Sequence, residues 1–121
     1  MKIAITSSGQ TLADSIDMHF GRAKCFILAD TETGRATAHD NAQNLHAAQG
    51  AGIQSAETVA KLGAEMVITG SVGPKAYRAL QTAGIKIALV EAVCPGTEAL
   101  RRFKEGGLPV LDKPNSEGHW V

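Results

Sequence analysis

Nine residues near the N-terminus, 17–25, gather side chains that could bind an anion or a metal. They read Asp-Met-His-Phe-Gly-Arg-Ala-Lys-Cys, so His19 is followed within six positions by the cations Arg22 and Lys24 and by the thiol of Cys25. A neutral imidazole can coordinate a soft or borderline metal, and cations can offset the charge of an anionic ligand. The same residues also fit a surface histidine beside a glycine turn, so both interpretations stay open.

A second histidine lies among small residues in the segment 41–52. His46 is followed by Gly50 and Gly52, close to the expected start of a helix. Glycines allow a bulky ligand to approach the backbone, and the N–H groups at a helix N-terminus favour negative charge. His46 could therefore face His19 across a shallow cleft. An ordinary loop that leads into a helix is the competing interpretation.

A glycine turn connects an expected strand to an expected helix in the segment 66–76. Gly70, Ser71 and Gly73 form this turn, and backbone N–H groups in such turns can hold an anion. The turn lacks the glycine spacing and the Lys-Ser/Thr pair of a Walker phosphate-binding loop. It is equally well explained as a purely architectural connection.

Cys94 stands between an expected strand and an expected helix. The helix N-terminus would lower the pKa of its thiol and make it a better metal ligand. Open α/β sheets also bind ligands at the carboxyl ends of their strands. A partly buried cysteine without a chemical role is the alternative. Cys25, in contrast, begins an apolar run and is expected in the core.

Short apolar runs that alternate with alanine-rich segments predict an α/β fold that positions these residues. Strands are expected over 2–6, 25–29, 35–39, 64–69 and 85–90, and helices over 51–62, 74–82 and 95–104. Turn formers separate the second and third strands, which should form an antiparallel hairpin. The later strand–helix–strand alternation requires parallel crossovers. We therefore expect a mixed five-stranded sheet with about three flanking helices.

The composition is that of an ordinary globular domain. The chain has 121 residues, enough for one core, and its 12 basic and 12 acidic residues cancel, which gives no reason to expect binding to nucleic acid or an anionic membrane. No segment approaches the ~20 apolar residues of a membrane span or a secretory leader, so we expect a cytoplasmic protein. We expect one domain over residues 1–107 and a loosely ordered tail over residues 108–121, which is rich in Pro, Asn, Ser and Gly.

These segments resemble the family of nitrogenase iron–molybdenum cofactor-binding carriers. The resemblance rests on the His-Phe-Gly-Arg-Ala run at 19–23, the Asn/His/Gly segment, the Gly-x-x-Gly turn at 70–73 and the Ala-Gly-Ile run at 83–85, and it covers roughly residues 2–103. It implies a ribonuclease H-like three-layer fold. It also implies the binding, carriage or storage of a preformed anionic metal–sulfur cluster that is exchanged with a donor or acceptor protein.

The resemblance further implies the cargo and its contacts. Carriers of this family bind the iron–molybdenum cofactor or its precursor, whereas the orange-protein branch, which this chain resembles in length and architecture, holds a molybdenum–copper sulfide cluster without covalent attachment. The molybdenum–copper cluster is therefore the favoured cargo, and the iron–molybdenum cofactor is the alternative. We expect cluster contacts from His19, Phe20, Gly21, Arg22, Lys24, His46, Gly50, Gly52, Gly70, Ser71 and Gly73. The candidate metal ligands are His19, His46 and, on its position alone, Cys94.

Signatures of catalysis are absent from the sequence. A ribonuclease H-like nuclease needs several convergent carboxylates that begin in its first strand, and residues 2–6 contain none. Neither a G-x-S-x-G elbow nor a G-x-G-x-x-G fingerprint opening a helix is present. We therefore predict a non-enzymatic protein. A metal-free regulatory or protein-interaction module, or a small nucleotide binder, could use the same cleft, and a hydrolase acting through carboxylates is a weaker alternative.

Overall fold

A computed structural model describes residues 1–41 and 50–115 of the chain. The strands are β1 (Lys2–Ser7), β2 (Cys25–Asp30), β3 (Ala36–Asp40), β4 (Met66–Thr69) and β5 (Lys86–Leu89). The helices are α1 (Ala51–Lys61), α2 (Pro74–Thr82) and α3 (Gly96–Lys104), with a short 3₁₀ helix, η1 (Phe20–Arg22), between β1 and β2. The five strands and three α-helices predicted from the sequence are thereby confirmed, whereas η1 was not expected.

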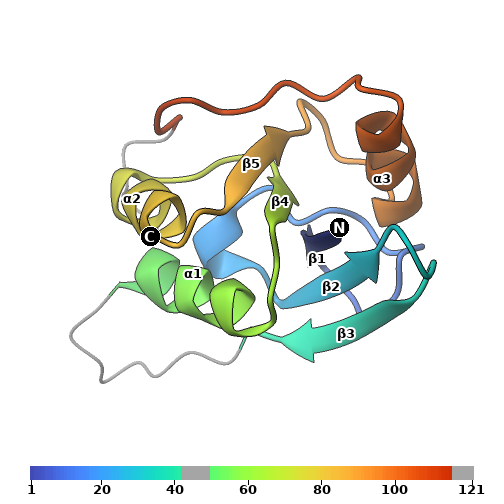
Figure 1. Cartoon of the computed structure of the whole chain (residues 1–121), viewed down its shortest axis with the longest axis horizontal. Coiled ribbons are helices and arrows are strands. Elements are labelled where there is room, and N and C mark those ends of the chain that lie inside the picture. Colours follow the sequence, from blue (N-terminus) through green and yellow to red (C-terminus); the bar gives the residue numbers. More distant parts are fainter. Residues whose placement is uncertain (42–49, 116–121) are drawn as a thin grey trace.

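The five strands form one mixed sheet in the order β3-β2-β1-β4-β5 (Figure 1). The hairpin of β2 and β3 is antiparallel, and β2 is also antiparallel to β1. On its other side β1 is parallel to β4, which is parallel to β5. The predicted mixed sheet is thus confirmed, and β1 and β4 lie side by side with their carboxyl ends at the same edge. Assignment to the ribonuclease H-like group stays a prediction.

Helices cover both faces of the sheet because successive strand residues point to opposite sides. On one face Ala4 and Val67 belong to the same apolar cluster as Val59 of α1 and Leu80 of α2. On the other face α3 closes a second cluster, whose sheet residues include Ile3, Ile5, Ile27 and Ile68. Full burial of one such side chain contributes roughly 1.5–3 kcal/mol. The two clusters give the fold three layers.

The C-terminal segment 108–115 differs from the expectation of a loosely ordered tail. Its backbone pairs with β5, where Leu89 N–H donates to the Pro109 carbonyl at 2.9 Å and Leu111 N–H donates to the Ile87 carbonyl at 2.8 Å. An edge strand presents unpaired backbone groups, and this segment satisfies some of those of β5. The composition alone did not reveal this pairing because the segment carries turn-forming residues beside its apolar ones.

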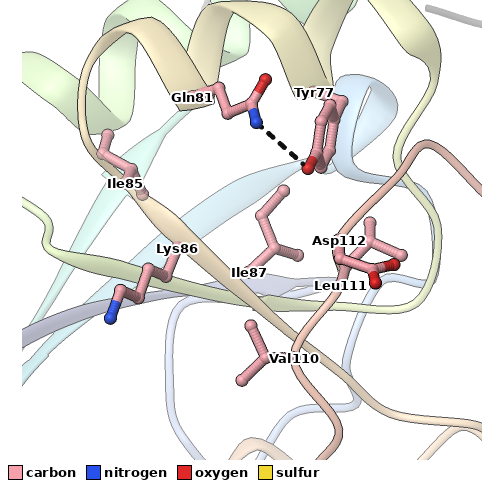
Figure 2. A pocket seen from close by; sticks show the side chains of 8 residues that line it. All are labelled: Tyr77, Gln81, Ile85, Lys86, Ile87, Val110, Leu111 and Asp112. Carbon is pink, nitrogen blue, oxygen red and sulfur yellow. Dashed lines mark hydrogen bonds between the residues drawn. The ribbon is translucent and has the colours of Figure 1, made fainter.

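A pocket of about 350 Å³ lies between α2, β5 and this segment. Figure 2 shows Tyr77 and Gln81 on the helix side, Ile87 on the strand and Val110 and Leu111 on the C-terminal segment. None of the residues that line it is among the cluster contacts expected from the sequence. Among the described helices, none is both long and apolar enough to span a membrane.

Candidate functional site

The expected metal ligand His19 lies where the carboxyl ends of β1 and β4 meet. The chain leaves β1 and returns to it at Asp17, whose N–H donates to the Thr6 carbonyl at 3.0 Å. The Thr6 hydroxyl, which is fully buried, in turn donates to the Asp17 carbonyl at 2.6 Å. The Asp17 carboxylate then accepts the N–H of His19 at 3.1 Å. The backbone that leads into His19 is therefore fixed to the end of β1.

Ser71, which follows β4, holds the side chain of His19. The Nδ1 atom of His19 lies 3.0 Å from Ser71 Oγ, and Ser71 Oγ donates its proton to the Met18 carbonyl at 3.0 Å. Since a serine hydroxyl has a single proton, Ser71 Oγ accepts the hydrogen bond from Nδ1–H. A neutral ring protonated at Nδ1 has its lone pair on Nε2, which is a suitable metal-coordinating atom. The Ser71 carbonyl also accepts the Phe20 N–H at 3.1 Å.

Gly70 is required by this close packing. A β-carbon at position 70 would lie 2.8 Å from the Met18 carbonyl oxygen and closer still to the Met18 side chain. Only glycine therefore lets the segment before His19 lie against the turn. Gly70 was expected among the cluster contacts, whereas in the structure Met18 fills the space beside it.

Phe20 is a correction to the expected contacts. Its side chain is fully buried, and its ring centroid lies 5.8 Å from that of Phe26 in the core. A ring with 0% exposure cannot touch a ligand that arrives from solvent. Burial of its large apolar surface instead anchors η1 to the sheet. Gly21, the next residue of η1, is also buried.

Arg22 and Lys24 are exposed, on either side of the buried Ala23. They follow His19 by three and five residues, so this short segment combines an imidazole with two cations. Exposed cations can attract an anion, although solvent and salt weaken that attraction. The structure thus places both expected cations at the surface.

A buried polar network that was not predicted from the sequence connects η1 to α1 and to the end of β3. Ser55 of α1 has 0% exposure and donates through Oγ to the Gly21 carbonyl at 3.3 Å. Asn41 Nδ2, just after β3, donates to Ser55 Oγ at 3.0 Å and to the Ala23 carbonyl at 2.9 Å. The signal was present, because position 55 lies on the apolar face of α1. A serine on that face requires a polar partner.

The remaining expected glycines lie at the starts of α1 and α2. Gly50 and Gly73 are the N-cap residues, Gly52 is in the first turn of α1, and Gly52 and Gly73 are buried. Neither helix carries an acidic residue in its first turn. The first N–H groups of a helix bear partial positive charge, so both helix starts favour an anion. The expected ligand His46 lies in residues 42–49, outside the described residues.

Cys94 is a second correction. It is 7% exposed and belongs to the apolar cluster beneath α3 with Ile16 and Ala99. Burial raises the pKa of its thiol, and the charge of Glu98 raises it further, whereas a lowered pKa was expected from the helix N-terminus. Cys25 is buried as expected, and burial raises the pKa of its thiol as well.

Residues 1–41 and 50–115 contain no group of three or more His, Cys, Asp or Glu side chains that could hold a metal ion. The residues brought together within this part of the chain are His19 and Ser71, with Met18 and Gly70 packed beneath them. The exposed cations Arg22 and Lys24 belong to the same segment as His19. The arrangement is an exposed imidazole whose ring is held by a hydrogen bond to Ser71.

The chain is similar to several known proteins over most of its length. The apo form of the orange protein from Desulfovibrio gigas is 40% identical with a TM-score of 0.89, and the match covers 95% of this chain and 96% of that one. A Thermotoga protein of the DUF35 family, whose structure was solved by NMR, is 32% identical with a TM-score of 0.81, and the match covers 97% of this chain and 98% of that one. An uncharacterised protein of Methanocaldococcus jannaschii is 29% identical over 110 residues, or 89% of each chain.

The family assignment agrees with the sequence resemblance. Residues 1–106 match the model of the family described as dinitrogenase iron-molybdenum cofactor. This match includes His19, the glycine turn with Ser71 and all five strands of the sheet. The chain therefore belongs to the dinitrogenase iron-molybdenum cofactor family.

Proposed function

We propose that this protein binds and carries a preformed, anionic, molybdenum-containing metal–sulfur cluster. The observation that carries the proposal is the His19–Ser71 hydrogen bond at 3.0 Å, which orients the imidazole ring of an exposed histidine. Family membership and the similarity to the orange protein support a metal cluster or cofactor as the ligand. A molybdenum–copper sulfide cluster is our favoured cargo, with the iron–molybdenum cofactor as the alternative.

The chemistry of the site suits a cargo that must be released again. His19 supplies one coordinating nitrogen, and Arg22 and Lys24 offset part of the negative charge of the cluster. Backbone N–H groups at the starts of α1 and α2, near Gly50, Gly52 and Gly73, are further candidate donors to sulfide. Few direct bonds allow dissociation, unlike the four side-chain ligands of a closed structural zinc site.

Two of the expected contacts, Phe20 and Cys94, are excluded from this proposal, whereas His46 is retained. Phe20 and Cys94 are buried and serve the core. His46 is kept as a candidate second ligand on the strength of the family resemblance. We further propose that residues 1–107 form the cluster-binding unit, that it acts without catalysis, and that a donor or acceptor protein exchanges the cargo with it.

An anaerobic titration tests the proposal. The metal-free protein is mixed with tetrathiomolybdate and Cu(I), desalted, and analysed by visible absorption and by molybdenum and copper content. Stoichiometric retention of both metals with new charge-transfer bands is expected. A parallel titration with isolated iron–molybdenum cofactor tests the alternative cargo. If the protein retains neither cluster, the carrier proposal is wrong, and the metal-free module or the nucleotide binder becomes the better explanation.

A further inference from the structure

The C-terminal segment ends, within the described residues, in a clamp on the turn that follows β4. Asn115 makes three hydrogen bonds to this turn. Its side-chain Oδ1 accepts the Val72 N–H at 2.7 Å, and its Nδ2 donates to the Gly70 carbonyl at 3.1 Å. Its own N–H donates to the Val72 carbonyl at 3.2 Å. One residue therefore binds the backbone on both sides of Ser71.

The turn is consequently held from two directions. On one side Ser71 contacts Met18 and His19, and on the other side Asn115 contacts Gly70 and Val72. Val72 has 0% exposure, so its backbone groups need partners inside the protein. Asn115 supplies a partner to both its N–H and its C=O. Without these bonds the position of Ser71, and through it the orientation of the His19 ring, is less well defined.

The route of the segment explains how Asn115 reaches the turn. Backbone pairing at Pro109 and Leu111 holds the segment antiparallel to β5 along the edge of the sheet, and four residues after Leu111 the chain reaches the turn that precedes α2. Leu111 packs against the apolar cluster beneath α1 and α2, which fixes the segment between these hydrogen bonds and the clamp. This segment lies beyond the residues 1–106 that match the family model. The clamp is thus a feature of this chain that the family match does not contain.

We propose that Asn115 is a positioning residue for His19, acting through Val72, Gly70 and Ser71. One part of this proposal rests on the proposed function: by holding the His19 ring in position, Asn115 should make the binding of the cluster tighter. Its structural part is independent of any cargo, because it concerns how rigidly the turn holds the imidazole. Removing a side chain that orients a metal-ligating histidine typically weakens metal binding by about 10–100-fold.

The first arm of the test needs no cluster. The variant Asn115→Ala removes both side-chain hydrogen bonds, and Leu108→Ala is the matched control, because Leu108 lies on the same segment but packs against the α3 cluster. Hydrogen exchange at the Val72 amide and the ¹⁵N shifts of the His19 ring are measured by NMR. Asn115→Ala should accelerate exchange at Val72 and move the ring shifts away from the Nδ1–H tautomer. Leu108→Ala should do neither.

The second arm measures cluster affinity with tetrathiomolybdate and Cu(I). Asn115→Ala should bind about tenfold more weakly than the parent chain, and Leu108→Ala should bind as the parent does. If Asn115→Ala leaves the His19 ring shifts unchanged, or binds the cluster as tightly as the parent or more tightly, the positioning role is wrong. If the parent itself binds no cluster, the proposed function fails, and the ring shifts alone still decide whether Asn115 orients His19.

Discussion

Replacing Ser71 with alanine removes one hydroxyl that connects two parts of the site. Ser71 Oγ accepts from His19 Nδ1 and donates to the Met18 carbonyl, both at 3.0 Å. Alanine keeps the backbone and the β-carbon, so the Phe20 N–H can still donate to the carbonyl of residue 71. The variant therefore tests the orientation of the His19 ring without changing the path of the chain.

The expected effect is small on stability and larger on binding. Each hydrogen bond contributes about 1 kcal/mol, and Ser71 is only half-buried, so water replaces part of the loss. The free energy of unfolding should fall by about 1 kcal/mol. The affinity for the cluster should fall about tenfold, because the ring is no longer held with its lone pair on Nε2. Tenfold corresponds to about 1.4 kcal/mol of binding free energy.

The assay combines urea denaturation with anaerobic titration of the cluster. Ser8→Ala is the matched control, because Ser8 Oγ also donates to a backbone carbonyl, that of Ser15 at 3.0 Å, on an exposed loop. Ser71→Thr retains the hydroxyl and should restore most of the affinity. Combining Ser71→Ala with His19→Ala should weaken binding no further than His19→Ala alone. Independent, additive losses in the double variant would refute the claim that Ser71 acts through His19.

Three further predictions concern packing and the thiols. Gly70→Ala forces a β-carbon against Met18, so the free energy of unfolding, measured by urea denaturation, should fall by about 1–3 kcal/mol. In the control Gly107→Ala the nearest atom to the new β-carbon would be 3.4 Å away, so its free energy of unfolding should change little. Phe20→Ala should lower the free energy of unfolding by about 3–5 kcal/mol, and a smaller loss would contradict the place of Phe20 in the core. Cys25 and Cys94 should react slowly with Ellman's reagent at pH 7 and rapidly in urea, which exposes them. Burial raises the pKa of both thiols above the ordinary value of 9.0. The stability that comes from keeping these thiols protonated in the folded protein is therefore complete below pH 9.0 and is lost as the pH rises through the folded-state pKa values.

The periodic elements were the easiest features to predict from the sequence. Proline at position 74 and the glycines at 63 and 84 marked helix limits correctly, since Gly63 and Gly84 adopt φ of 82° and 75°, which favours glycine. The antiparallel hairpin also followed from local turn chemistry. These features depend on residues that are close in sequence, and so the pattern alone reveals them.

Long-range contacts account for what the sequence did not reveal. The Ser71 hydroxyl meets His19 across 52 positions, and Asn115 meets Gly70 across 45. No local pattern encodes such pairs. The pKa of Cys94 was predicted in the wrong direction because a helix start was visible in the sequence, whereas the apolar cluster that buries the thiol was not. Phe20 was expected at the ligand because it belongs to the His-Phe-Gly-Arg run that carries the family resemblance, whereas its burial depends on the distant strand β2.

The most direct measurement is the cluster affinity of His19→Ala compared with that of His39→Ala. His39 lies on β3, and its Nε2 bonds to the Thr37 hydroxyl at 2.8 Å, so the control removes an imidazole that has no expected contact with the cargo. We expect His19→Ala to bind the molybdenum–copper sulfide cluster at least about tenfold more weakly than the parent, and His39→Ala to bind it as tightly as the parent does. Equal affinity of the parent and His19→Ala would contradict the assignment of His19 as the cluster ligand.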